Sequence, residues 1–250
     1  MPMISRTINC KDCGEEFETQ VLTFGESKGE KEYFSDMCPT CAKLRDKARE
    51  VADAEKEAAK QAARLAYARE HYPELALAAG IPPRLHSADL TTMARDAGNA
   101  EAIETSEGIL KSETGGIVYL TGEAGTGKTW IAAALCRERI INLKPARFVR
   151  SNDLLNIIRA GFKSNTEVTD PFKTLPFIVI DDLGAECFTE WSIGYWYDLI
   201  DYRYNYLLPT VITSNLPLKD LKTKVSARVV SRIAESSMGV KLTGKDRRTK

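Results

Sequence analysis

A glycine-rich segment in the middle of the chain has the residue types and spacing of a phosphate-binding loop. It fits the pattern G-x-x-x-x-G-K-[ST] at every position and consists of Gly122, Glu123, Ala124, Gly125, Thr126, Gly127, Lys128 and Thr129. The glycines let the backbone wrap around a phosphate, and the N–H groups of the loop and of the following helix then face the anion. We expect Lys128 to reach the β- and γ-phosphates of ATP and the Thr129 hydroxyl to hold Mg²⁺. Apolar residues at 117–120 and 130–136 predict the flanking strand and helix that such a loop requires.

Two acidic residues follow a second apolar run, at residues 177–180. This run predicts a buried strand beside the strand that precedes the phosphate loop. We expect Asp181, at its end, to hold Mg²⁺ and Asp182 to polarise the attacking water. A third apolar run, 210–213, leads into Asn215, which we expect to orient that water or to sense the γ-phosphate. Taken alone, Ser-Asn after a strand more often marks only a turn.

The cysteines near the N-terminus have the spacing of a metal site. Cys10 and Cys13 form one C-x-x-C pair, and Cys38 and Cys41 form a second pair about 25 residues later. Four thiolates in this pattern complete a tetrahedron around Zn²⁺ with no open position, which indicates a structural site. The segment between the pairs has few apolar residues, so zinc would supply most of its folding free energy. A redox dithiol pair or unpaired cysteines are the alternatives.

Charge is distributed unevenly along a chain whose formal net charge is zero. Residues 1–41 carry four Lys/Arg and eight Asp/Glu, whereas residues 219–250 carry ten Lys/Arg and three Asp/Glu. The acidic zinc module favours protein docking over DNA binding, because DNA would repel it. The basic end indicates either contact with nucleic acid or phosphate, or a solvated tail. No apolar run approaches the ~18 residues of a membrane span, so we expect a cytoplasmic protein without membrane contact.

A helical linker is predicted between the cysteines and the phosphate loop. Residues 42–72 contain ten alanines and many charges, with no glycine or proline before Pro73. They predict one helix of about 45 Å. Its thin apolar stripe favours a solvated spacer over a strong coiled coil. We therefore expect a zinc-binding module at 1–41, a helical linker at 42–74 and an ATPase domain at 75–250.

The last of these regions resembles the DnaC/DnaI/IstB group of AAA+ ATPases, which are replicative helicase loaders and their transposition relatives. The residues that carry the resemblance, besides the phosphate loop, are 80–84 (GIPPR), 180–184 (IDDLG), 201–204 (DYRY), 213–215 (TSN) and 226–233 (SARVVSRI). The resemblance implies an α/β fold, a P-loop NTPase with a parallel sheet. Only about 35 residues follow Asn215, too few for the usual helical lid, and loaders of this group share that shortened end.

The resemblance also assigns roles to arginines by matched position. Arg228 falls where the family places the arginine finger, which reaches the ATP of a neighbouring subunit. Arg232, one helical turn later, is a second candidate, and the alternative for both is a surface arginine on a helix. Arg248 matches a terminal arginine that senses the γ-phosphate, with Arg247 and Lys245 as competitors for that position. Asp182 departs from the glutamate of many AAA+ proteins, which suggests slow hydrolysis.

The resemblance implies an ATP-dependent helicase loader with ATP, Mg²⁺ and Zn²⁺ as cofactors. Such a protein docks on a replicative DNA helicase, through its zinc module as in DnaI-type loaders, and places the helicase on single-stranded DNA during replication initiation. It also implies ATP-dependent self-association, with Arg159 and Lys163 as candidate contacts to single-stranded DNA. One alternative is an IstB-like transposition helper that binds duplex DNA and a transposase. Another is a zinc-containing adaptor with a vestigial ATPase, against which the intact motifs argue.

Overall fold

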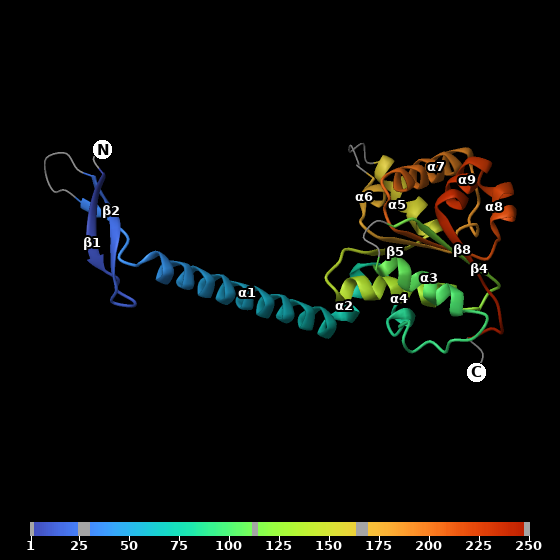
Figure 1. Ribbon diagram of the computed structural model, residues 1–250. Coiled ribbons are helices and arrows are strands. Elements are labelled where there is room, and N and C mark those ends of the chain that lie inside the picture. The colour runs from blue at the N-terminus through green and yellow to red at the C-terminus, as the bar shows by residue number, and fades with distance from the viewer. Residues whose placement is uncertain (1–2, 25–30, 112–114, 164–169, 248–250) are drawn as a thin grey trace. The chain divides into compact units, whose positions relative to one another are not determined.

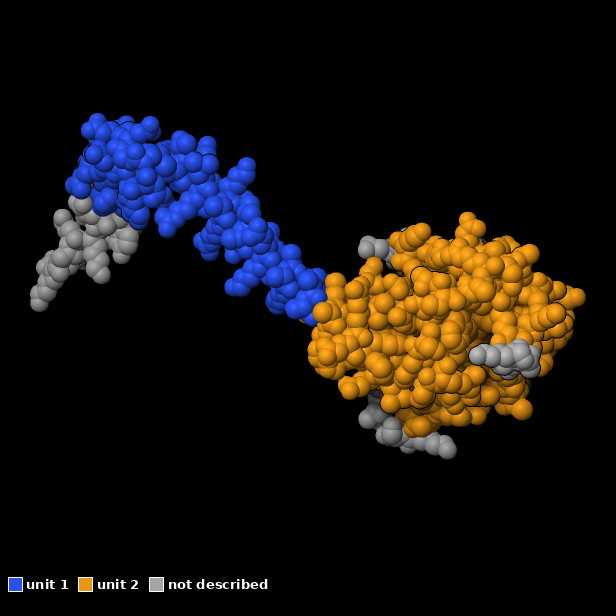
Figure 2. All heavy atoms as spheres, turned by 90° about the horizontal axis from the view of Figure 1, so that it is seen from below, with its two compact units in different colours: residues 1–63 blue, residues 64–250 orange. Residues whose placement is uncertain are grey.

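The chain divides into two compact units, Met1–Ala63 and Arg64–Lys250 (Figure 2). The computed structural model describes residues 3–24, 31–111, 115–163 and 170–247. The boundary between the units falls within helix α1 (Pro39–Glu70). No helix in these described ranges is long and apolar enough to cross a bilayer.

The first unit contains a small antiparallel sheet and most of α1. Its strands are β1 (Met3–Asn9), β2 (Glu16–Phe24) and β3 (Lys31–Tyr33), in the order β1-β2-β3. Its few buried side chains include Val21 and two of the cysteines. The helix predicted over 42–72 is confirmed with slightly different bounds, and it is followed by α2 (Tyr72–Ala78). Ala68 is the one buried residue assigned to α1, as expected for a solvated helix.

The second unit is built on a parallel sheet of five strands. These are β4 (Ile117–Gly122), β5 (Arg147–Arg150), β6 (Ile178–Asp181), β7 (Thr210–Ser214) and β8 (Ser237–Leu242), in the order β5-β6-β7-β4-β8. The expectation that the acidic strand β6 lies beside β4 is wrong, because β7 lies between them and pairs with both. All three strands are short buried apolar runs, and such a run does not specify its neighbours.

Helices cover both faces of this sheet (Figure 1). On one face lie α2, α3 (Ala100–Lys111) and α4 (Lys128–Ile141), packed against Val118 and Leu120 of β4. On the other lie α5 (Ser151–Lys163), α6 (Pro171–Thr174), α7 (Glu190–Asn205), α8 (Leu218–Lys224) and α9 (Ala227–Ser236). Ile117 and Tyr119 face this second layer. The alternation along β4 follows from the two-residue period of a strand and gives each layer its own apolar core.

The C-terminal part completes the sheet. After β7 the described chain forms α8 and α9, and β8 then returns to pair with β4 as the edge strand. This arrangement confirms the predicted α/β fold with a parallel sheet.

Candidate functional site: a nucleotide cavity and a cysteine cluster

The phosphate loop connects β4 to α4 with the backbone geometry that its glycines allow. Gly122, Gly125 and Gly127 have φ values of 147°, 84° and 104°. A Cβ atom at Gly122 would lie 2.2 Å from the Leu242 carbonyl oxygen, so only glycine fits there. Lys128 is buried, and its ammonium donates to the carbonyl oxygens of Gly122 (2.8 Å) and Glu123 (2.7 Å). The loop thus holds the lysine at the entrance of the phosphate cradle.

The C-terminal segment packs against the same loop. The Arg247 N–H donates to the Gly125 carbonyl oxygen (2.9 Å), and its Nε donates to the Thr126 carbonyl oxygen (3.2 Å). The Arg247 guanidinium also pairs with Asp96. Arg247 therefore reaches the nucleotide site, whereas Arg248, assigned from the resemblance, lies outside the described residues.

Asp181 ends β6 in a pocket lined by hydroxyl groups. Its side chain is 4% exposed and accepts a hydrogen bond of 2.7 Å from the Thr213 hydroxyl on β7. Burial raises the pKa of Asp181, and hydrogen bonds from Thr213 and Thr129 oppose this rise. A carboxylate beside a hydroxyl is a donor set that suits Mg²⁺, so Thr129 and Asp181 fit the ion that they are predicted to hold.

Asp182 adopts a backbone conformation that is uncommon for residues other than glycine, with φ of 64°. Its N–H donates to the Thr213 hydroxyl (2.9 Å), and its carboxylate accepts a hydrogen bond of 3.2 Å from the Asn215 amide. The predicted water-polarising acid and the predicted water-orienting amide are therefore direct neighbours, although β6 and β7 are far apart in sequence.

One cavity of about 690 Å³ collects most of the predicted nucleotide-site residues. Its lining includes Ala124, Gly125, Gly127, Lys128, Thr129, Asp181, Asp182 and Asn215. Gly122, Glu123 and Thr126 shape the loop without lining the cavity. The cavity lies outside the carboxyl ends of the strands, where ligands bind in parallel α/β sheets.

Three arginines line this cavity: Arg84, Arg150 and Arg247. Arg150 was not predicted, because only the pairing of β5 with β6 places this strand end beside Asp181. Arg84 was recognised only as part of a family motif. These guanidinium groups give the cavity the positive charge that a polyphosphate requires.

Arg228 does not line the cavity and is exposed on α9. Arg232 donates to Asp201 (2.7 Å) and lies over the Tyr204 ring, 5.0 Å from its centroid. Arg232 thus interacts with residues of its own chain, and Arg228 is exposed to solvent.

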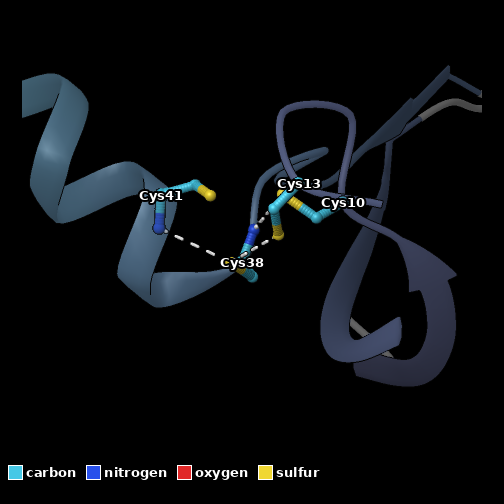
Figure 3. Close-up of side chains that lie close together, drawn as sticks. All are labelled: Cys10, Cys13, Cys38 and Cys41. Atoms are coloured by element: carbon cyan, nitrogen blue, oxygen red, sulfur yellow. Dashed lines mark hydrogen bonds between the residues drawn. The ribbon is translucent and has the colours of Figure 1, made fainter. Parts of the chain in front are cut away.

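The four N-terminal cysteines form a cluster (Figure 3). Cys10 and Cys13 lie in the turn after β1, and Cys38 and Cys41 lie at the start of α1. Their sulfur atoms all lie within 4.8 Å of one another, with Cys13 and Cys38 3.7 Å apart. Ligands at ~2.3 Å around a tetrahedral Zn²⁺ are about 3.8 Å apart, so the cluster fits zinc.

Backbone N–H groups favour the thiolate form of Cys10, whereas the neighbouring Cys13 and Cys38 side chains raise the pKa of Cys41. The Cys38 N–H donates to the Cys10 sulfur (3.3 Å), and with the Cys13 N–H it lowers the pKa of Cys10 to about 6. A thiolate is the form that binds metal. The sulfur spacing and this hydrogen bonding are consistent with the predicted structural zinc site.

Comparison with known proteins agrees with this geometry. The IstB-like ATP binding protein family matches residues 73–245. The replicative helicase loader DnaI of Bacillus subtilis (strain 168) is 28% identical over 149 residues, which cover 52% of this chain and 47% of DnaI. The chain thus spans about half the length of the curated relatives it matches. The cysteine cluster precedes the family match.

Solved structures of helicase loaders share the fold. The crystal structure of the DnaC helicase loader has a TM-score of 0.58 and 25% identity, covering 65% of this chain and 100% of that one. The crystal structure of DnaI has a TM-score of 0.56 and 25% identity, and the match covers 66% of this chain and 93% of that one. The predicted resemblance to the DnaC/DnaI/IstB group is therefore confirmed. The chain belongs to the IstB-like ATP binding protein family, within the AAA+ P-loop ATPases of the DnaC and DnaI type.

Proposed function

We propose that this protein is an ATP-dependent helicase loader, which docks on a replicative DNA helicase and places it on single-stranded DNA during replication initiation. The observation that carries the proposal is the complete nucleotide site around one cavity, in a chain whose relatives are named replicative helicase loaders. A site that retains its lysine, its two acids and its amide argues against a vestigial ATPase.

Five residues of the cavity have a role in the proposed ATP cycle. Lys128 would leave the loop carbonyl groups and bind the β- and γ-phosphates. Thr129 and Asp181 would hold Mg²⁺, which would neutralise phosphate charge. Asp182 polarises the attacking water, and Asn215 positions it. We expect slow hydrolysis, which suits a switch, because the shorter side chain of Asp182 replaces the glutamate common in AAA+ proteins.

Self-association would complete the site. Arg228 is exposed and outside the cavity of its own chain, so it is available to the ATP of a neighbouring subunit. An arginine supplied in this way stabilises the charge that develops on the transferred phosphoryl group. ATP would therefore favour an oligomer, and Arg159, exposed on α5 with its guanidinium over Trp191, is a candidate contact for single-stranded DNA in it.

The zinc module is the proposed docking element for the helicase. It has eight Asp/Glu against four Lys/Arg and is held together by a few buried groups around the four cysteines. Docking should therefore depend on zinc, whereas nucleotide binding should not.

A binding experiment separates these steps. The full chain is mixed with the replicative helicase of its own source and an ATP analogue, with and without zinc, and complexes are measured by size exclusion with mass detection. We expect a zinc-dependent complex that Lys128→Ala still forms, and loss of ATP-dependent loading in that variant. Wild-type loading by Lys128→Ala would refute the ATP-dependent mechanism, and absence of a complex in either state would refute helicase docking.

A transposition helper is the second candidate, because the family that matches the chain is named for IstB. Such a protein would prefer duplex DNA and bind a transposase. Preference for duplex over single-stranded DNA in a binding titration, without a helicase complex, would favour this function.

A further inference from the structure

A buried glutamate, Glu186, lies behind the acidic turn and has no role in the chemistry described above. It is 6% exposed, and burial raises its pKa. Its Oε2 atom accepts hydrogen bonds from the Gly184 N–H (2.8 Å) and the Ser151 hydroxyl (2.9 Å). Its Oε1 atom has no hydrogen-bond partner within the described part of the chain. Burying a carboxyl group in this state costs free energy, so stability alone does not explain its position.

The Ser151 hydroxyl connects Glu186 to the backbone of Asp182. Its oxygen lies 3.0 Å from the Asp182 carbonyl oxygen and 2.9 Å from the Glu186 carboxylate, so its single proton is shared between two acceptors. The Ala185 N–H also approaches the Asp182 carbonyl oxygen, at 3.3 Å. The turn over residues 182–186 is thus held by its own glutamate and by the first residue of α5.

This turn includes the left-handed backbone of Asp182, which needs support from its surroundings. A residue other than glycine remains at such a φ only when neighbouring groups hold it there. The Thr213 hydroxyl supports the Asp182 N–H from β7, and Ser151 supports the carbonyl group from α5. Removal of the Glu186 carboxylate would leave the Gly184 N–H without this acceptor and the Ser151 hydroxyl without the group that orients it, so the turn would relax.

We propose that Glu186 is a positioning residue for ATP hydrolysis, which holds Asp182 through Ser151 and the Gly184 N–H so that the Asp182 carboxylate faces the nucleotide cavity. The inference rests on the proposed ATPase function, and Glu186 itself touches neither nucleotide nor water. Because Ser151 begins α5, the same hydrogen bonds link the position of α5 to the orientation of Asp182.

The test separates positioning from binding and from folding. ATP hydrolysis is measured under saturating ATP with single-stranded DNA and helicase for the wild type, Glu186→Ala, Glu186→Gln and the exposed control Glu104→Ala. Affinity for a fluorescent non-hydrolysable ATP analogue and the thermal unfolding midpoint are measured for each. We expect kcat of Glu186→Ala to fall on the order of 10²-fold with unchanged analogue affinity, because small displacements of a reacting group have such effects. Glu186→Gln keeps an acceptor oxygen and should retain most of the activity.

A double-mutant cycle tests the route through Ser151. If both residues act through one hydrogen bond, Ser151→Ala combined with Glu186→Ala should lose no more activity than Glu186→Ala alone. Wild-type kcat in Glu186→Ala would overturn the inference. It would also be overturned if Glu186→Ala lost analogue affinity as much as kcat, or if kcat fell equally in Glu186→Ala and Glu186→Gln. Absence of hydrolysis in the wild type would instead refute the proposed ATPase function, and with it this inference.

Discussion

Replacement of Asp182 by asparagine should separate its chemical role from its structural one. The carboxylate lies in the cavity beside Asn215, and the backbone has a φ of 64°. Asparagine tolerates this conformation and has nearly the same shape, but it cannot polarise water as a base does. We therefore expect Asp182→Asn to fold normally and to bind ATP while hydrolysing it slowly.

The magnitudes follow from these two properties. Loss of a general base lowers kcat by about 10²- to 10⁴-fold, which is about 2.7–5.4 kcal/mol in the barrier. The free energy of unfolding of Asp182→Asn should stay within about 0.5 kcal/mol of wild type. Asp182→Ala should lose the same activity and also about 1–2 kcal/mol of stability, because alanine is strained at positive φ.

Three measurements check this reasoning. Hydrolysis is followed at saturating ATP, binding with a fluorescent non-hydrolysable analogue, and stability by urea unfolding monitored through tryptophan fluorescence. Asp182→Asn with kcat within a factor of about three of wild type would refute the role as base. Equal stability of the alanine and asparagine variants would refute the strain argument. Asp182→Gly, which removes the strain, serves as the matched backbone control.

Other substitutions test the remaining parts of the site. Gly125→Ala would place an alanine at a φ of 84°, where a Cβ atom is strained, so analogue affinity should fall about tenfold or more; unchanged affinity would contradict a loop conformation that requires glycine. Zinc removal or Cys38→Ser should unfold residues 1–41, seen by NMR, without loss of analogue binding; lost binding would contradict independent folding of the two units. Arg228→Ala and Lys128→Ala should each abolish hydrolysis, and their mixture should recover part of it; no recovery would contradict an arginine supplied by a neighbour.

The sequence predicted those features that depend on residues close together in the chain. The phosphate loop, the acids after an apolar run and the paired cysteines are local patterns. In the structure the first is a loop after β4, the second lies at the end of β6, and the third is a cluster of four sulfur atoms. The long helix was equally predictable from its alanines and the absence of glycine and proline. Each of these patterns reflects a physical requirement of its own segment, such as positive φ at Gly127.

Features that depend on pairing between distant segments could not be predicted. The order of the strands was misjudged because β4, β6 and β7 are all short and fully apolar at their centres. Arg150 and Glu186 belong to the site only through this order, which brings the end of β5 beside β6. Likewise, Arg203 has no exposed surface and donates to the carbonyl oxygens of Phe172 in α6 and of Pro209. It thus links α7 to these two segments, which the family motif alone did not reveal.

The turn at residues 182–186 is contacted from three directions, and this suggests what controls hydrolysis. Ser151 reaches it from α5, Thr213 from β7, and Lys224 of α8 donates to the Gly184 carbonyl oxygen (3.1 Å). The phosphate loop, by contrast, already holds Lys128 with short hydrogen bonds. Phosphate binding requires only that Lys128 leave these two carbonyl groups. We expect hydrolysis to depend instead on the turn at residues 182–186, which is touched by α5 and by α8, the helix that precedes the one carrying Arg228. Contacts that move either helix, through DNA or a neighbouring subunit, should alter kcat more than the affinity for ATP.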